Sequence, residues 1–416
     1  MVVSETHLNS SSGAEYSFMD LDDSAQVMLV LTPRGRGTFR EQVQEVLSAL
    51  HAVLDKQLQP MTVTVQTVFL RDPHDRVRCE QILAVHYGSR LPVTNFVLQP
   101  PCCGAALAME VWAIGGDLVR VDYFSPQTLA VSYNRVRWVY CAGITPAGPA
   151  SGAYTQTLAA LKWMRAALDQ AGSGFEHVIR TWFYLGGITE PEANTQRYEE
   201  LNRARTDLYR DIHFCSSLLQ PDIPHRVYPS STCIGMAGVG LVASCLALET
   251  RRKDVFLLSL ENPRQTPAYY YQPRYSLKSP KFSRATALVL GNYVTTWISG
   301  TASIVNSESR HLNDVKKQTE QTIDNIERLI SPENFSAHGA SGAGARLHDF
   351  AKIRVYLKRR QDFAKCKAIC EHRFGSVPAI YTIADICRPE LLVEIEGVAF
   401  SRYSPKDTYP LEEAQR

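Results

Sequence analysis

An internal duplication constrains the fold of this chain more than any other feature of the sequence. The first copy begins with the strand-like segment Trp138–Ile144 and closes with Leu241–Glu249, and the second runs from Thr296–Ala302 to Leu391–Phe400. Each copy has the same order of expected elements: strand, helix, strand, helix, strand, strand. The repeat therefore predicts two copies of one α+β unit in tandem.

The predicted helices of both copies are amphipathic. Val315, Thr319, Thr322, Ile326 and Leu329 recur every three or four residues in the second copy, and residues 158–168 carry a similar stripe in the first. Stripes of this kind usually face a core, so we expect the helices of each copy to pack on one face of a mixed sheet. The predicted fold class is α+β, with two tandem α/β sandwich domains.

Segments outside the two copies complete the expected organisation. The expected boundaries are 1–26 for a leader, 27–255 for an N-terminal domain, 256–405 for a C-terminal domain with a loop insertion at 331–349, and 406–416 for a tail. The leader is Ser-rich and acidic, without the basic start and apolar core of a signal peptide, so we expect it to be disordered. Residues 27–133 are expected to add a sheet and a helix to the first copy.

Composition and charge argue against several classes of partner. The 416 residues carry a net charge of +2 without a Lys/Arg block, which disfavours nucleic acid or a membrane surface. No segment approaches the roughly 18 apolar residues of a membrane span. The ten cysteines form no CxxC pair and mostly lie in apolar runs, which favours reduced thiols and a cytoplasmic location. The histidines show no ligand spacing, so we expect no metal and no cofactor.

One glutamate of the closing strand of the second copy is a candidate general acid. The segment Leu392–Val398 alternates, which places Glu394 and Glu396 on one face of an apolar strand. Desolvation there would raise the pKa of Glu394 toward neutrality. A half-buried strand with two solvated glutamates is the alternative. If Glu249 of the first copy matches Glu396, then Ala247 occupies the position of Glu394, and the chain has one such acid.

The motifs of both copies resemble the Rid (reactive-intermediate deaminase) fold. They are Ser299–Ala302, the helix Asp314–Ile326, the strand Lys352–Leu357 and the closing segment Val393–Ala399. The tandem form, with Leu260–Tyr269 opening the second copy, resembles the chorismatases, which cleave the enolpyruvyl ether of chorismate and release pyruvate. The similarity runs from about residue 134 to residue 401. Each motif alone is weak, but their order and spacing together are specific.

The resemblance implies roles for three residues. Glu394 would protonate the enol ether. The branch of the family that forms 3-hydroxybenzoate carries a glycine in the Ser-Gly-Thr-Ala motif and a cysteine seven residues before the glutamate, which here are Gly300 and Cys387. The branch that hydrolyses chorismate to a dihydrodiol acid carries alanine at the first position. By resemblance this chain forms 3-hydroxybenzoate, and Gly300 and Cys387 keep water away from the ring.

Substrate binding by a chorismatase requires fixed cations, because chorismate carries two carboxylates. The candidates are Arg264, Tyr271 and Lys281 before the second copy, and Arg205 in the first. Solvated surface side chains are the alternative for each of them. We expect the pocket at the junction of the two copies. The arginine that holds the substrate in simple Rid deaminases is absent from Pro378–Tyr381, which disfavours imine deamination.

Three functions remain open from the sequence. They are a chorismatase that forms 3-hydroxybenzoate, a hydrolytic chorismatase that forms a dihydroxycyclohexadiene carboxylate, and a non-catalytic Rid-like protein that binds a metabolite. The oligomeric state is equally open, and a monomer or a trimer is compatible with the tandem arrangement.

Overall fold

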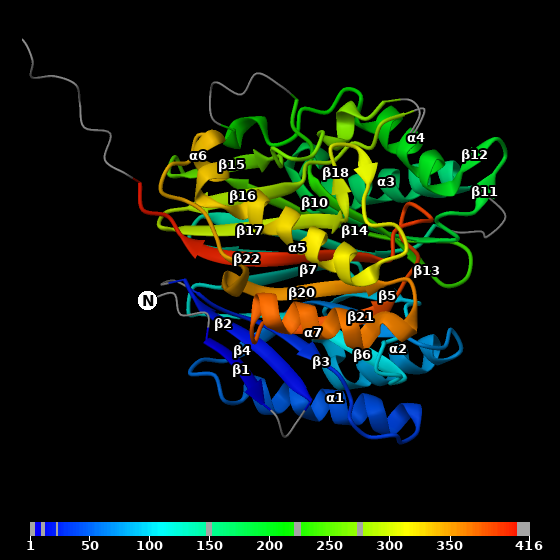
Figure 1. The fold of residues 1–416 in the computed structure, drawn as a ribbon. Helices are drawn as coiled ribbons and strands as arrows, with labels where there is room; N and C mark the ends of the chain where they lie inside the picture. Colours follow the sequence, from blue (N-terminus) through cyan, green and yellow to red (C-terminus); the bar gives the residue numbers. More distant parts are fainter. Residues whose placement is uncertain are drawn as a thin grey trace, which may run out of the picture.

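Three six-stranded sheets form the body of the protein (Figure 1). The structure, a computed structural model, describes residues 5–9, 13–21, 24–146, 152–219, 226–272 and 278–405. We name the segments that form the three sheets unit 1 (residues 5–115), unit 2 (residues 120–250) and unit 3 (residues 255–402). Units 2 and 3 contain the two copies predicted from the sequence, and their elements confirm the predicted α+β fold class.

All three sheets have the same strand order, with the last strand of each unit inserted between its third and fourth. Unit 1 comprises β1 (Glu5–Asn9), β2 (Ala14–Asp20), β3 (Ala25–Leu31), α1 (Phe39–Leu54), β4 (Met61–Leu70), α2 (Asp75–Tyr87), β5 (Val93–Val97) and β6 (Leu107–Gly115). Unit 2 comprises β7 (Arg120–Ser125), β8 (Thr128–Tyr133), β9 (Val136–Ile144), α3 (Ala153–Gln170), β10 (Val178–Gly186), the hairpin β11 (Pro191–Glu192) and β12 (Thr195–Gln196), α4 (Arg197–Tyr209), β13 (Ser230–Met236) and β14 (Leu241–Thr250). Unit 3 comprises β15 (Val255–Leu260), β16 (Ala285–Leu290), β17 (Tyr293–Ala302), the hairpin β18 (Ile304–Val305) and β19 (Glu308–Ser309), α5 (Val315–Ile330), α6 (Pro332–Ala337), β20 (Phe350–Leu357), α7 (Phe363–Phe374), β21 (Ala379–Ile383) and β22 (Val393–Arg402).

Each sheet buries both of its faces. The helices of a unit cover one face, as α1 does in unit 1 and α5 and α7 do in unit 3 (Figure 1). The opposite faces share one core, in which Met28 of unit 1, Trp138 of unit 2 and Trp297 of unit 3 belong to the same apolar cluster. Burial on both faces explains why these strands read as nearly continuous apolar runs.

A buried polar cluster lies where the three sheets meet. Arg354 of β20 donates to Glu110 of unit 1 at 2.6 Å and to Glu396 of β22 at 2.9 Å. Lys352 also pairs with Glu110, and Arg180 of unit 2 pairs with Glu396. Burial alone would raise the pKa of Glu110, but the charges of Arg354 and Lys352 outweigh it and bring that pKa to about 2. The cluster therefore joins side chains of all three units as ions.

Unit 1 corrects two predictions about the N-terminal part. Strands β1 and β2 lie inside the segment 1–26 that we expected to be disordered, and the buried Ser17 hydroxyl donates to the carbonyl of Ala351 at 2.8 Å. The strands of residues 27–115 join β1 and β2 in a sheet of their own, and only β7 and β8 extend the sheet of the first copy. The chain therefore has three such units and not two with an appended sheet.

The segment 331–349 is also more ordered than the predicted loop. Its helix α6 begins after Ser331, whose side chain accepts a hydrogen bond from the Asn334 amide, and Phe335 is fully buried in the core of unit 3. The sequence did not predict this helix, because the segment is rich in glycine and alanine and six residues are too few to show a helical hydrophobic period. The predicted tail, 406–416, lies outside the described residues.

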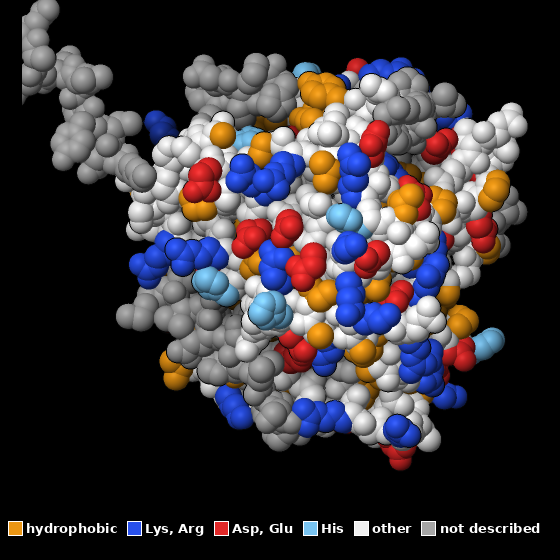
Figure 2. Space-filling model, viewed as in Figure 1, with side chains coloured by type: hydrophobic (Ala, Val, Ile, Leu, Met, Phe, Trp, Pro, Cys, Tyr) orange, Lys and Arg blue, Asp and Glu red, His pale blue; other side chains and the backbone are white. Residues whose placement is uncertain are grey.

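The surface carries mixed charge on the side shown in Figure 2, where Lys, Arg, Asp and Glu are interspersed and apolar areas are small. Among the described residues no helix combines the length and apolar character needed to cross a bilayer.

Candidate active site

A bulge at the same place in all three sheets gives a structural alignment of the units. The fourth strand is irregular between Val63 and Val65, between Val178 and Arg180, and between Phe350 and Lys352. Counted from the bulge, Glu394 matches Val242 of unit 2 and Ala108 of unit 1, while Glu396 matches Ser244 and Glu110. Among the described residues, Glu394 is therefore the only acid at its position in the three units.

This alignment corrects the one made from the sequence. Ala247 does not match Glu394, and Glu249 does not match Glu396, because the true partners lie five residues earlier in β14. Glu249 lies at the far end of that strand, where it pairs with Arg137 at 3.1 Å. The similar Glu-containing ends of the two strands misled the comparison, since the bulge that fixes the register leaves no mark in the sequence.

A cavity of about 190 Å³ lies between units 2 and 3, at the junction where we expected the pocket. Unit 3 contributes the end of β17, the start of β22 and residues 387–390. Unit 2 contributes α4 and β13. Of the residues predicted from the sequence, the cavity is lined by Glu394, Gly300, Cys387, Tyr271 and Arg205.

The Glu394 carboxyl group is almost fully withdrawn from solvent. Its residue is 4% exposed and lies near the start of β22, where the strand enters the cavity wall. Burial, and then the negative charge of Glu396, raise the pKa of Glu394 to about 8, against the opposing charges of Arg180 and Arg284. The group is consequently mostly protonated near pH 7 and can donate a proton.

Glu396, two residues further along the same face, has the opposite electrostatic character. It accepts hydrogen bonds from Arg354 at 2.9 Å, from the Tyr356 hydroxyl at 2.7 Å and from the Trp182 indole at 3.0 Å. Burial opposes ionisation, but Arg354 and Arg180 prevail and lower the pKa of Glu396. Its fixed negative charge is one reason that Glu394 stays protonated.

Gly300 faces the carboxyl group of Glu394 from the neighbouring strand. A Cβ atom built on Gly300 would overlap Oε1 of Glu394 and would lie 2.9 Å from its Cδ and 3.2 Å from Cγ2 of Thr232. The Gly300 amide donates to the Thr232 hydroxyl at 2.9 Å. The absence of a side chain at position 300 therefore leaves the space that the carboxyl group of Glu394 occupies.

Three arginines, Arg205, Arg284 and Arg388, line the cavity, and the first two of them are buried. Arg205 is 1% exposed and lies against the rings of Phe183 and Phe282, and one of its terminal nitrogens donates to the Lys281 carbonyl. Arg284 is 3% exposed and donates to the Tyr271 hydroxyl at 2.6 Å. The buried Nε atoms of both arginines have no hydrogen-bond partner among the described residues. Such unpaired donors suit a bound anion.

Arg264 and Lys281 do not line this cavity, so the structure does not support their predicted part in binding substrate. Arg264 is exposed on the turn after β15, and the Lys281 ammonium group donates instead to the Ser279 hydroxyl at 2.7 Å. Arg284, a buried residue of the same segment, lines the cavity instead. Tyr198, Cys233 and Phe282 also line the cavity, and no motif marked them.

Cys387 lines the cavity without the properties of a nucleophile. Desolvation, and then the nearby charge of Glu394, raise the pKa of the Cys387 thiol to about 12, and the positive charge of Arg388 does not compensate. A thiol with such a pKa carries almost no thiolate near neutrality. Its contribution is the shape and the low polarity of the wall.

Comparisons with known proteins agree with this geometry. The chain is 34% identical over 270 residues to a 3-hydroxybenzoate synthase of Streptomyces hygroscopicus, covering 63% of this chain and 73% of that protein. It is 33% identical over 279 residues to a chorismatase of Streptomyces rapamycinicus, covering 64% of this chain and 78% of that protein. A solved chorismatase structure superposes with a TM-score of 0.64 at 21% identity, over 91% of this chain and all of that one. No protein-family model matches the chain.

Proposed function

Because the chain belongs to the chorismatase family, we propose that it cleaves the enolpyruvyl ether of chorismate to pyruvate and 3-hydroxybenzoate, with Glu394 as general acid. The observation that carries the proposal is the Glu394 carboxyl group, which is buried in an arginine-lined cavity and has a pKa of about 8. A general acid works best when its pKa lies near the pH at which it acts.

The first step is protonation of the terminal methylene carbon of the enol ether. Glu394 donates this proton, and the substrate becomes an oxocarbenium ion beside its own carboxylate. The Glu394 carboxylate that remains is negative and close to the new cation. Because Glu394 is 4% exposed, this attraction is screened less than it would be in bulk solvent.

The two buried arginines of the cavity are suited to hold the carboxylates of chorismate. The guanidinium groups of Arg205 and Arg284 are fixed by their contacts with Lys281 and Tyr271, and each keeps a buried Nε donor for a ligand. Bidentate binding would orient the enolpyruvyl group toward Glu394. Tyr271, held by Arg284, would line the same side of the substrate.

The identity of the second product depends on water. Pyruvate and 3-hydroxybenzoate together contain all the atoms of chorismate, so their formation adds no water, whereas the hydrolytic reaction adds one molecule. We assign the exclusion of water to the wall at Gly300 and Cys387. The ring hydroxyl oxygen then bonds to the cationic carbon and gives its proton to the Glu394 carboxylate. The bond from that oxygen to the ring breaks as the ring carbon that bears the ether oxygen loses its proton, which makes the ring aromatic. The bond between the ether oxygen and the pyruvyl carbon then breaks, so that pyruvate leaves and the ether oxygen takes up a proton as the phenol of 3-hydroxybenzoate.

The experiment that tests the proposal is a chorismate assay with two readouts. Pyruvate release is coupled to lactate dehydrogenase, and the ring product is identified by chromatography and mass spectrometry. We expect equimolar pyruvate and 3-hydroxybenzoate. Glu394→Gln should lose a factor of about 10²–10⁴ in rate, while Glu327→Gln, an exposed residue of α5, should behave as wild type.

Two results would contradict the proposal. Pyruvate release at the wild-type rate by Glu394→Gln would remove Glu394 from the proton transfer. A dihydroxycyclohexadiene carboxylate as the main product of the wild-type protein would remove the assignment of the product and leave the acid in place.

A further inference from the structure

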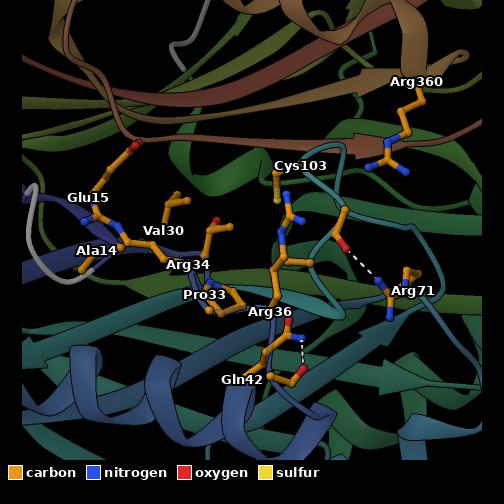
Figure 3. A pocket seen from close by; sticks show the side chains of 16 residues that line it. Ala14, Glu15, Val30, Pro33, Arg34, Arg36, Gln42, Arg71, Cys103 and Arg360 are labelled. Atoms are coloured by element: carbon orange, nitrogen blue, oxygen red, sulfur yellow. Dashed lines mark hydrogen bonds between the residues drawn. The ribbon is translucent and has the colours of Figure 1, made fainter.

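A second cavity, lined by arginine, lies between units 1 and 3 (Figure 3). Its volume is about 990 Å³, and its wall includes Arg34, Arg36 and Arg71 of unit 1 and Arg360 of unit 3. We propose that this cavity binds a small organic or inorganic polyanion, bearing two or more phosphate or carboxylate groups, at a site separate from the one that cleaves chorismate.

The second cavity adjoins the place in unit 1 that the catalytic cavity occupies in unit 3. That place is a cavity of about 420 Å³, which is lined by Ala108 of β6 and by residues of α7 and β21 of unit 3. The catalytic cavity is built on the ends of β17 and β22 and on the connection before β22, and it is closed by the neighbouring unit. Their counterparts in unit 1 are β3, β6 and the connection before β6. The second cavity is lined by residues 30–37 around the end of β3, by residues 103–105 of that connection, and by Arg360 of the neighbouring unit.

Unit 1 has no acidic residue at the position that Glu394 occupies in unit 3. Ala108 matches Glu394 in the alignment of the units, and it lines the space directly adjoining the arginine cavity. The repeated architecture thus provides a cavity between units in both places, with a proton donor in one and with four arginines beside the other. Binding of an anion without cleavage follows from that difference.

The four guanidinium groups are not neutralised by the protein. None of the four forms an ion pair with a carboxylate of the described residues, whereas Arg76, Arg137 and Arg373 elsewhere do. In Figure 3 Arg34 and Arg36 come from one loop, whereas Arg71 and Arg360 approach from two other segments of the chain. Arginine gathered in this way, without acidic partners, is the usual means of binding phosphate or carboxylate.

The backbone at Gly104 shows that two of these arginines are positioned closely. Nη1 of Arg71 donates to the Gly104 carbonyl at 2.7 Å, and the Arg360 guanidinium covers the same residue, with Cζ 3.4 Å from the place a Cβ would occupy. Any side chain at Gly104 would displace Arg360, and its φ of +88° favours glycine as well. The site therefore depends on local geometry and not only on composition.

One carboxylate, that of Glu15, lies in the described wall. Glu15 accepts a hydrogen bond from the Ala379 amide at 3.1 Å, and its burial raises its pKa above the ordinary value. Among the described residues that line this cavity, Glu15 is the only acidic one, against four arginines. The described wall therefore carries a net positive charge. The carboxylates of Glu41 and Glu45 lie beside it, where they accept hydrogen bonds from the backbone amides of residues 34, 35 and 38.

Calorimetric titration with two probes tests the proposal. Pyrophosphate and citrate are each titrated into the full chain at low ionic strength, in the absence of chorismate. We expect one saturable site for at least one of them, and the probe that binds more tightly distinguishes phosphate from carboxylate ligands. The double variant Arg36→Gln/Arg360→Gln should bind about tenfold or more weakly, because it loses two donors of charge-assisted hydrogen bonds.

Control variants separate this site from the catalytic cavity. Arg251→Gln, an exposed arginine outside both cavities, and Arg284→Met, in the catalytic cavity, should leave binding unchanged. Absence of saturable binding of both probes, or full affinity in the double variant, would overturn the proposal. So would loss of binding in Arg284→Met alone, since the anion would then occupy the catalytic cavity. Because no turnover is measured, the result is independent of the proposed function.

Discussion

Replacement of Gly300 by alanine should disable the proton donor without unfolding the protein. The added Cβ would overlap Oε1 of Glu394 and lie 2.9 Å from its Cδ, whereas ordinary contacts begin at 3.4 Å. The carboxyl group must therefore retreat by at least about half an ångström, and its oxygen by more. Thr232 gives little room on the other side, since its Cγ2 would be 3.2 Å from the same atom.

The expected magnitude has two parts. Overpacking of this kind costs about 1–3 kcal/mol of folding stability. Displacement of a catalytic group by about 1 Å can cost about 10²-fold in rate. We therefore expect kcat/KM for pyruvate release to fall by about 10- to 100-fold in Gly300→Ala, with a modest decrease in Tm. The share of the hydrolytic product should rise, because the branch with alanine at this position adds water.

The assay is pyruvate release, with the ring products separated by chromatography and Tm measured by circular dichroism. The informative control is the double variant Gly300→Ala/Glu394→Asp. Aspartate is shorter by one methylene and withdraws the carboxyl group from the new methyl group. The two changes should therefore be non-additive, so that the second costs far less in the alanine background than in wild type.

A wild-type rate and an unchanged product mixture in Gly300→Ala would refute this reasoning. Strict additivity of the two substitutions would do so as well, because it would show that position 300 and the carboxyl group do not compete for space.

Three other perturbations test the electrostatics of the site. With a pKa of about 8 for Glu394, kcat/KM should stay level below pH 8 and fall tenfold per pH unit above it. The folded chain retains the Glu394 proton up to about pH 8, whereas the unfolded chain loses it near pH 4.5, so the free energy of unfolding falls as pH rises between these values. Glu394→Gln cannot lose a proton there and should therefore have a higher Tm than wild type at pH 8. Arg284→Met should raise KM by about 10- to 100-fold when chorismate is titrated. Arg284→Lys should restore little of this loss, because lysine keeps the charge but cannot bind a carboxylate bidentately. Glu396→Gln should lose about 3–5 kcal/mol in urea unfolding, because Arg354 keeps a buried charge with one partner fewer; a loss under 1 kcal/mol would contradict an ionised Glu396.

The sequence predicted most of units 2 and 3 because their elements keep a clear period. The closing strand was expected at Leu391–Phe400 and lies at Val393–Arg402, and the helix expected from Asp314 is α5, Val315–Ile330. Unit 1 was not recognised as a third copy. Its helix α2 buries only Cys79 and Leu83, so the pattern of a helix between two strands is weak there.

The candidate site was predictable where a residue belonged to the closing strand or to a motif, as Glu394, Gly300 and Cys387 do. The arginines were harder to choose. Arg264 and Arg284 are equally basic and lie in one segment, but a turn exposes the first, while the start of β16 directs the second into the cavity. The residues from unit 2, such as Tyr198 and Cys233, reach the cavity only through contact between distant parts of the chain.

The ion cluster among the three sheets limits how this protein can be divided. A fragment that began after residue 115 would keep Lys352 and Arg354 but lose their partner Glu110, and it would expose the apolar face that unit 1 covers. The residues of the proposed active site, which lie in units 2 and 3, would then belong to a less stable fold. A domain that replaced unit 1, in the laboratory or during evolution, would need an acidic residue at the position of Glu110.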